Sequence, residues 1–342
     1  MCSNPAHEDT ALQLIEPREV PLGGLRAMTV RRTLPQRARS FIGAWCFLDH
    51  YGPDDVSDTG GMDVAAHPHI GLQTASWLFS GEIEHRDSAG FHAFVRPGEL
   101  NLMTAGRGIS HSERSTPGTT VLHGAQLWIA LPQHAADIAP DFSHYEPPVV
   151  AGPGWNAQVF LGSLLGSTSP VQPHTPLLGA ELRLEPGGTL EIPVTPGFEH
   201  GVLVDAGSVE FARMSSDSVT RLDLAADQLG FAPLGATTLR LTAGADGARL
   251  LLLGGEPLAE NLIMWWNFVG RSHEEILQAR ADWQAGIAAA GVADPSGAAM
   301  PASPTTPPGP IDDARFGLPA NEPAPPLPAP AAPAARLVPR RQ

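Results

Sequence analysis

The most constraining feature of this sequence is a regular alternation of short strand-like runs and tight turns over residues 72–106. The runs "LQTASWLF", "EIEHRDS" and "FHAFV" are separated by "SG" and "AG", and "RPGE" precedes "LNLMTAG". Strands this short, joined by turns this regular, are typical of antiparallel sandwiches and barrels. Because "GAQLWIALP" ends the block at 124–132, we predict an all-β domain over residues 1–145.

A second block with the same rhythm predicts another all-β domain over residues 146–271. It contains "AELRLEPGGTLEIPV" and "HGVLVDAGSVEF", each of which is a strand, a glycine-containing turn and a strand. The run "ARLLLLGG" is apolar apart from Arg249 and predicts a strand at the centre of a sheet. The chain is therefore expected to fold as two antiparallel β-domains in sequence.

The C-terminal part of the chain changes pattern. "SHEEILQARADWQAGIAA" predicts a short helix within 272–292, because Ser272 and Glu275 form a capping-box sequence ahead of a loosely amphipathic run. Residues 293–342 are rich in proline and alanine, and we expect this tail to be largely disordered. Only "ARFGLP", at 314–319, has the character of a docking segment.

Composition narrows the class of protein. The 342 residues carry a formal net charge of −15, which disfavours a nucleic-acid-binding surface, because phosphate neutralisation needs a basic stripe. The two cysteines, Cys2 and Cys46, do not suggest a disulfide framework. The chain has neither a leader pattern at its start nor an apolar run of the ~18 residues that a membrane span requires. We expect a cytoplasmic monomer.

Two pairs of donor side chains stand out in the first block. His67 and His69 in "HPHIG" are spaced i, i+2, and His111 and Glu113 in "HSE" have the same spacing. Residues two apart in a strand point to the same face, so two facing strands would bring three imidazoles and one carboxylate together. Such donors suit Fe, Mn, Ni, Cu or Zn, and the lack of cysteine disfavours a structural zinc site. We predict one divalent transition metal at these four residues.

The remaining histidines are weaker candidates. His85 and Asp87 in "EHRDS" are also spaced i, i+2, but lie on a hairpin arm expected to be partly exposed. We interpret them as surface residues or as partners of the ligands. The isolated histidines are interpreted as loop or satisfied core residues: His92, His123, His144, His174 and His200.

The first half closely resembles the pirin family of the cupin superfamily in four motifs: "HPHIG", "LFSGEIEHRDSAG", "RPGELNLMTAGRGISHSE" and "LHGAQLWIALP". The resemblance implies a bicupin, that is, two antiparallel jelly-roll β-barrels of which only the first binds metal. In that family the ligands are the two histidines of HPH and the His and Glu of HSE. These positions are His67, His69, His111 and Glu113, with Fe as the first expectation ahead of Mn, Ni, Cu, Co and Zn.

Two functions follow from the resemblance. Some pirin-like proteins resemble quercetin 2,3-dioxygenase, which opens the heterocycle of a flavonol with O2 and releases CO. This implies a small aromatic substrate and a catalytic role for Glu113 as the group that accepts the hydroxyl proton. The alternative is a non-enzymatic, metal- or redox-dependent regulatory partner of a transcription factor or metabolic enzyme. The sequence does not choose between them.

The sequence also departs from the family pattern. Where pirins commonly have "HPHRGF" followed by Glu, this chain has "HPHIGL" followed by Gln73. The second block has no H-x-H, and counting back from its glycine turn places Pro193 and Thr195 at the corresponding positions, in agreement with a metal-free second barrel. We expect the substrate pocket of the first barrel to be lined by Ile70, Gln73, Met103 and Phe47.

Overall fold

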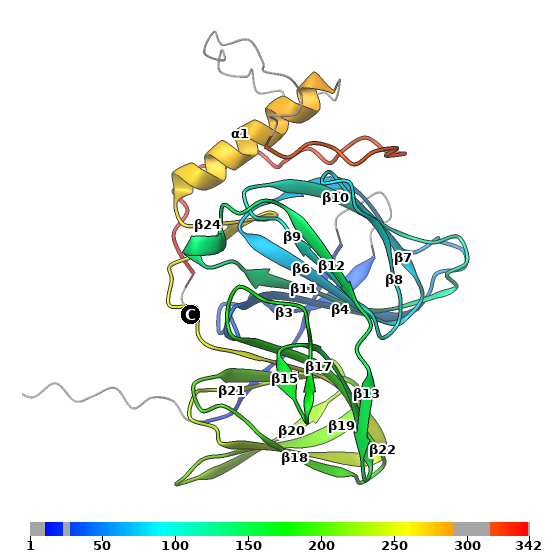
Figure 1. Cartoon of the computed structure of the whole chain (residues 1–342), viewed down its shortest axis with the longest axis vertical. Coiled ribbons are helices and arrows are strands. Elements are labelled where there is room, and N and C mark those ends of the chain that lie inside the picture. Colours follow the sequence, from blue (N-terminus) through cyan, green and yellow to red (C-terminus); the bar gives the residue numbers. More distant parts are fainter. Residues whose placement is uncertain (1–10, 23–27, 291–314, 341–342) are drawn as a thin grey trace, which may run out of the picture. The chain divides into compact units, whose positions relative to one another are not determined.

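The computed structural model describes residues 11–22, 28–290 and 315–340 of the chain (Figure 1). It divides into two compact units. The first unit consists of the described residues within 19–32, 46–146 and 259–342, and the second of those within 1–18, 33–45 and 147–258. Within the described residues, no helix is long and apolar enough to cross a membrane.

Two large antiparallel sheets, the β23–β24 hairpin and a C-terminal helix build the first unit, and most of its strands follow the runs expected from the sequence. The seven-stranded sheet has the order β12-β9-β6-β11-β4-β3-β2, and the four-stranded sheet has the order β5-β10-β7-β8. The elements are β2 (Arg18–Pro21), β3 (Thr29–Leu34), β4 (Trp45–Asp55), β5 (Asp63–His69), β6 (Leu72–Ser80), β7 (Ile83–Asp87), β8 (His92–Val95), β9 (Leu100–Thr104), β10 (Ile109–Ser115), β11 (Val121–Ala130), η1 (Gln133–Ala135), β12 (Asp141–Tyr145), β23 (Ile263–Trp265), β24 (Phe268–Gly270) and α1 (His273–Ala289).

One nine-stranded antiparallel sheet forms most of the second unit. Its main path is β1-β21-β19-β22-β17-β14-β13, while β18 pairs with β22 and β20 pairs with β19. The strands β15 and β16 form a separate hairpin. The elements are β1 (Gln13–Ile15), β13 (Val149–Gly152), β14 (Trp155–Leu161), β15 (Ser163–Leu164), β16 (Ser167–Thr168), β17 (Leu177–Leu184), β18 (Thr189–Pro193), β19 (Glu199–Met214), β20 (Val219–Ala225), β21 (Leu229–Ala232) and β22 (Thr238–Gly255).

The long strands β19 and β22 curve the sheet of the second unit around an apolar core. Their pairing register shifts between Val204 and Ala206 and again between Gly207 and Val209, and such bulges bend a strand. Gly207 has a φ of +78°, and a Cβ there would lie 2.0 Å from the carbonyl oxygen of Gly247, so only glycine fits. The apolar run "LLLL" lies in β22 between β17 and β19, which confirms the predicted central strand.

The all-β fold class and the single C-terminal helix are confirmed. The sheets are those of a cupin jelly roll, although they do not close into complete barrels. The division of the chain differs from the predicted one, because β1 pairs with β21 in the second unit and residues 259–290 belong to the first. Cys46 is a buried free thiol, whereas Cys2 lies outside the described residues.

The described part of the tail, residues 315–340, packs on the first unit, and it includes Phe316 of the "ARFGLP" segment that the sequence singled out for docking. Phe316 is 5% exposed, and its ring lies 6.0 Å from that of Phe268 and 5.8 Å from that of Trp283 on α1. Leu327 donates its backbone N–H to Ala66 on β5 at 2.8 Å. Residues 291–314, which include the start of the predicted tail, lie outside the described residues.

Candidate metal centre

The two strands that carry the predicted ligands are neighbours in the four-stranded sheet. β5 and β10 pair antiparallel, with His111 directly opposite His67. Because side chains alternate between the faces of a strand, His67, His69 and His111 all lie on one face. The register shifts between His111 and Glu113, so that Glu113 lies opposite Val64. The sheet therefore brings the three histidines together.

The backbone at the last position of "HPHIG" requires a glycine. Gly71 has a φ of +66°, and a Cβ there would lie 2.1 Å from the carbonyl oxygen of Val269. Any larger residue would push the end of β5 away from the β23–β24 hairpin, which also holds His69 through a contact to Asn267. The glycine thus allows the close approach that positions a candidate ligand.

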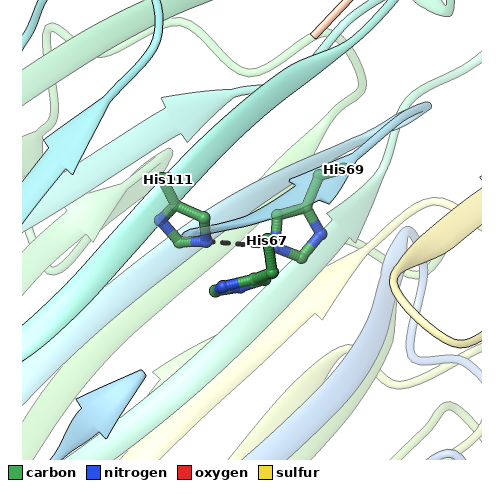
Figure 2. A group of neighbouring side chains, drawn as sticks. All are labelled: His67, His69 and His111. Carbon is green, nitrogen blue, oxygen red and sulfur yellow. Dashed lines mark hydrogen bonds between the residues drawn. The ribbon is translucent and has the colours of Figure 1, made fainter. Parts of the chain in front are cut away.

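The imidazoles of His67, His69 and His111 lie together, and the Nε2 atoms of His69 and His111 face each other (Figure 2). His67 Nδ1 lies 3.0 Å from the carbonyl oxygen of Ala65, and His69 Nδ1 lies 3.0 Å from that of Asn267. A carbonyl oxygen only accepts, so both Nδ1 atoms carry the proton and both Nε2 atoms keep a free lone pair. The Nε2 atoms of His69 and His111 are 3.0 Å apart.

Burial keeps these imidazoles neutral. His69 and His111 are each 1% exposed and His67 is 7% exposed. Burial lowers the pKa of His67 to about 4 and holds the pKa values of His69 and His111 well below the usual value, with neighbouring histidines adding to the shift. Neutral imidazoles with free lone pairs are what a transition metal requires of its ligands.

The donor set fits a metal ion. One nitrogen atom from each of His67, His69 and His111 lies within 4.8 Å of the others. Two nitrogen ligands ~2.1 Å from one ion and at right angles to each other are ~3.0 Å apart, which equals the Nε2 separation of His69 and His111.

Glu113 belongs to a second, overlapping group. Its carboxylate gathers with nitrogen atoms of His85 and His111 within 4.8 Å, but the structure does not place it within that distance of all three predicted histidine ligands. The Ser76 hydroxyl on β6 lies 3.3 Å from Glu113 Oε1. Burial raises the pKa of Glu113, while His85 and hydrogen bonds from Ser76 and Gln126 oppose that shift. The carboxyl is therefore a stronger base than an exposed glutamate.

His85 and Asp87 are buried, which corrects the prediction that their hairpin arm is partly exposed. They are 3% and 2% exposed, and they lie directly opposite Glu113 and His111 across β7 and β10. His85 Nδ1 lies 3.4 Å from His111 Nδ1, and His85 Nε2 lies 3.1 Å from Asp87 Oδ2. Asp87 is fixed in turn, since its Oδ1 accepts backbone N–H groups of the following turn.

A sequence signal for this burial exists. Ile83 precedes His85 and Asp87 with period two, and all three are buried while the intervening residues are half-buried. An apolar residue in phase with a polar pair indicates that the pair faces inward. This signal would have predicted that His85 and Asp87 lie beside the proposed ligands rather than at the surface.

Aromatic side chains flank the histidines. The Trp128 ring lies 5.2 Å from that of His69, edge to face, and Phe47 stacks on Trp128 at 4.1 Å. Of the other predicted lining residues, Ile70 differs: it packs with Phe268 in the cluster under α1. The remaining two, Gln73 and Met103, are buried on β6 and β9.

Comparison with known proteins agrees with this geometry. The family model "Pirin" matches residues 27–129, and the model "Pirin C-terminal cupin domain" matches residues 179–289. The chain belongs to the pirin family. The resemblance seen in the HPH and HSE motifs is thereby confirmed. The C-terminal model covers residues 179–258 of the second unit and continues through β23, β24 and α1, which belong to the first unit.

Several pirin relatives match over most of their length. A Pseudomonas aeruginosa protein named "Putative quercetin 2,3-dioxygenase PA1205" is 43% identical over 295 residues, which cover 85% of this chain and 89% of the relative. A pirin-like protein of Caulobacter vibrioides is 39% identical over 267 residues, covering 75% and 88%. The crystal structure of a quercetin 2,3-dioxygenase from Acinetobacter baumannii matches with a TM-score of 0.81 and 36% identity, covering 95% of this chain and 97% of that one.

Proposed function

We propose that this pirin is a metal-dependent dioxygenase that acts on a flavonol-type aromatic substrate. The observation that carries the proposal is the convergence of three neutral, buried imidazoles, with the Nδ1 atoms of His67 and His69 held by backbone carbonyls. The names of the Pseudomonas and Acinetobacter relatives supply the reaction class. The proposed ligands are His67, His69, His111 and Glu113.

The ion, when bound, supplies the Lewis acidity and redox chemistry that a reaction with O2 needs. Fe is the first expectation. The three nitrogen donors and one oxygen donor suit Mn, Ni, Cu, Co and Zn as well.

The protein's own groups would handle the proton. Glu113 is proposed to accept the proton of the flavonol hydroxyl, because its burial raises its pKa towards that of an effective base. The Ser76 hydroxyl at 3.3 Å orients the carboxylate, and Gln126 shares that hydroxyl at 2.8 Å. Trp128 and Phe47, 7% and 8% exposed, supply an apolar wall beside the histidines.

His85 and Asp87 are proposed to hold His111 in position. Asp87, fixed by two backbone N–H groups, orients His85, and His85 contacts the side of His111 that faces away from the other histidines. Outer partners of this kind orient ligands, and their loss typically weakens metal binding by ~10–100-fold.

The test combines metal loading with turnover. Protein is loaded separately with Fe(II), Mn(II), Ni(II), Cu(II), Co(II) and Zn(II), and quercetin absorbance and CO release are followed under air. Glu113→Gln should lower the rate per bound metal by roughly 10²–10⁴-fold, because an amide does not accept the proton. The matched control is Glu82→Gln, which changes a partly exposed carboxylate that pairs with Arg96 at 2.7 Å.

Two results would contradict the proposal. One is the lack of flavonol turnover with every metal. The other is a Glu113→Gln rate per bound metal that equals that of Glu82→Gln. Retained metal binding without turnover would instead favour the regulatory alternative, in which the loaded protein acts on a protein partner.

A further inference from the structure

The second unit contains a pocket that the proposed dioxygenase site does not use. Its volume is about 310 Å³, at the lower end of the range for small-molecule sites. Strands β15, β17 and β19 and the loop after β18 supply its walls. The lining residues are Gly162, Ser163, Leu164, Pro176, Leu177, Leu178, Val194, Thr195, Phe198 and His200.

His200 is the unusual residue of this pocket. It is 1% exposed, and neither ring nitrogen has a hydrogen-bond partner among the described residues. Its Nδ1 is enclosed by protein, so a ligand in the pocket would meet the Nε2 edge of the ring. Burial alone lowers the pKa of His200 to about 4, so the imidazole is neutral near pH 7. A buried polar atom without a partner is costly, and native proteins usually pair such an atom with protein, water or ligand.

The other walls limit what could pair with this imidazole. Leu164, Leu177 and Leu178 are buried apolar side chains of the lining, and none of the ten lining residues carries a formal charge. The Ser163 hydroxyl is already bonded to that of Thr168 at 2.9 Å. An anionic ligand would therefore lose hydration without gaining a cationic partner, which is unfavourable.

We propose that this pocket binds a small neutral phenol, whose hydroxyl pairs with His200 and whose ring packs against the apolar wall. A hydroxyl both donates and accepts, so it can satisfy a neutral imidazole in either tautomer, whereas a carbonyl satisfies only an N–H. The rings of Phe198 and His200, 6.2 Å apart, both line the pocket and offer aromatic contacts to a ligand ring. The volume suits a molecule of one or two rings.

The site is independent of the metal centre, since its residues all belong to the second unit. The sequence analysis treated His200 as a satisfied core histidine and Thr195 only as a position without a metal ligand. In the structure both line the same pocket.

Three fluorinated probes test the proposal by ¹⁹F NMR titration of the full-length protein. They are 4-fluorophenol, fluorobenzene, which lacks the hydroxyl, and 4-fluorobenzoate, which is anionic. 4-Fluorophenol should bind at least about fivefold more tightly than either of the others, the size expected for one net hydrogen bond. His200→Phe, which keeps a ring of similar shape, should lower 4-fluorophenol affinity to that of fluorobenzene.

Control variants separate this pocket from other binding. His92→Phe changes a histidine on β8 whose side chain is 50% exposed and should leave all three affinities unchanged. Thr195→Trp, at the exposed rim, should weaken both 4-fluorophenol and fluorobenzene by blocking the pocket. The double variant His67→Ala/His111→Ala should still bind 4-fluorophenol within about twofold of wild type, because the metal centre is not involved.

The proposal is overturned if 4-fluorophenol does not bind, or if it binds no better than fluorobenzene. It is also overturned if His200→Phe or Thr195→Trp leaves its affinity unchanged. Loss of 4-fluorophenol binding in the double variant would assign the phenol to the first unit instead.

Discussion

The two units share an antiparallel cupin architecture but fill their interiors with different chemistry. In the first unit the inward face of the four-stranded sheet carries buried polar groups from three adjacent strands, including His67, His85 and His111. In the second unit the core is built of leucine, valine and alanine side chains from β14 to β22. His200 is the one buried histidine in the described part of that unit.

This difference shows that the fold does not determine the function. Burying a polar group costs free energy unless it is paired, so a cluster of buried imidazoles is tolerated where neighbouring strands and loops supply partners. The backbone carbonyls of Ala65 and Asn267 play that role in the first unit. In the second unit apolar packing takes the place of such a network, as expected when function depends on the site that a fold carries.

The largest effect should come from removing donors in the first unit. His67→Ala/His111→Ala deletes two of the four proposed ligands and should reduce bound metal from about one ion per chain to background, because ligand loss weakens binding by orders of magnitude. His200→Ala in the second unit is the matched control and should keep full occupancy. Elemental analysis of the purified proteins measures both. Equal loss in the two variants would show that the comparison between the units is wrong.

The second-largest effect should come from the tail, which packs on the first unit and should stabilise that unit. Phe316→Ala removes a ring that is 5% exposed and packs on Phe268 and Trp283, so it should lower the free energy of unfolding of the first unit by about 3–5 kcal/mol. Val338→Ala changes a residue that is 73% exposed and should change the free energy of unfolding by less than ~0.5 kcal/mol. Urea denaturation followed by tryptophan fluorescence measures both. Matching curves for the two variants would show that the tail does not stabilise the first unit.

The candidate site was largely predictable because it depends on a local rule. A strand has a period of two, so the i, i+2 spacings of His67 with His69 and of His111 with Glu113 already place each pair on one face. Their meeting required only that β5 and β10 be neighbours, which the structure shows. The placement of Glu113 apart from His67 and His69 was not predictable, because the register of β10 against β5 shifts between His111 and Glu113.

Features that depend on distant residues were missed. The sequence singled out "ARFGLP" for docking, but it did not predict the site on which Phe316 packs, because Phe268 and Trp283 lie far away in the sequence. The unit boundaries depend on the pairing of β1 with β21, which are separated by more than half of the chain. Local composition contains no signal for such long-range pairing.

Acid should affect the second unit through His200. Its pKa falls from 6.5 in the unfolded chain to about 4 in the folded state because of burial. The contribution of His200 to the free energy of unfolding is therefore fully present above pH 6.5. It is lost as the pH falls towards 4, and the loss is about 3 kcal/mol. His200→Phe should remove that part of the loss, and His92→Phe should not. Urea denaturation between pH 7 and pH 4 would contradict the assignment if wild type and His200→Phe lose stability in parallel.

The smallest effect concerns α1, which belongs to the first unit alone. The Ser272 hydroxyl caps this helix by accepting the N–H of Glu275 at 3.1 Å, while Glu275 accepts the N–H of Arg271 at 2.6 Å. Ser272→Ala removes the first of these bonds and should lower the free energy of unfolding by about 1 kcal/mol. Ser272→Thr keeps a capping hydroxyl and should cost less. Hydrogen exchange at Glu275 measures the local effect.

An exposed serine of the second unit provides the control for this helix cap. Ser216 lies in the turn between β19 and β20, and its hydroxyl donates to the neighbouring Asp217 at 2.8 Å. Ser216→Ala should leave Glu275 exchange unchanged. Since α1 packs on β24 through Ile276, Ala279 and Trp283, the destabilisation by Ser272→Ala should appear in the unfolding of the first unit and leave the exchange of β22 amides unchanged. Faster exchange in β22 would mean that the two units unfold in one cooperative transition, so that their cores would not differ in the free energy of unfolding.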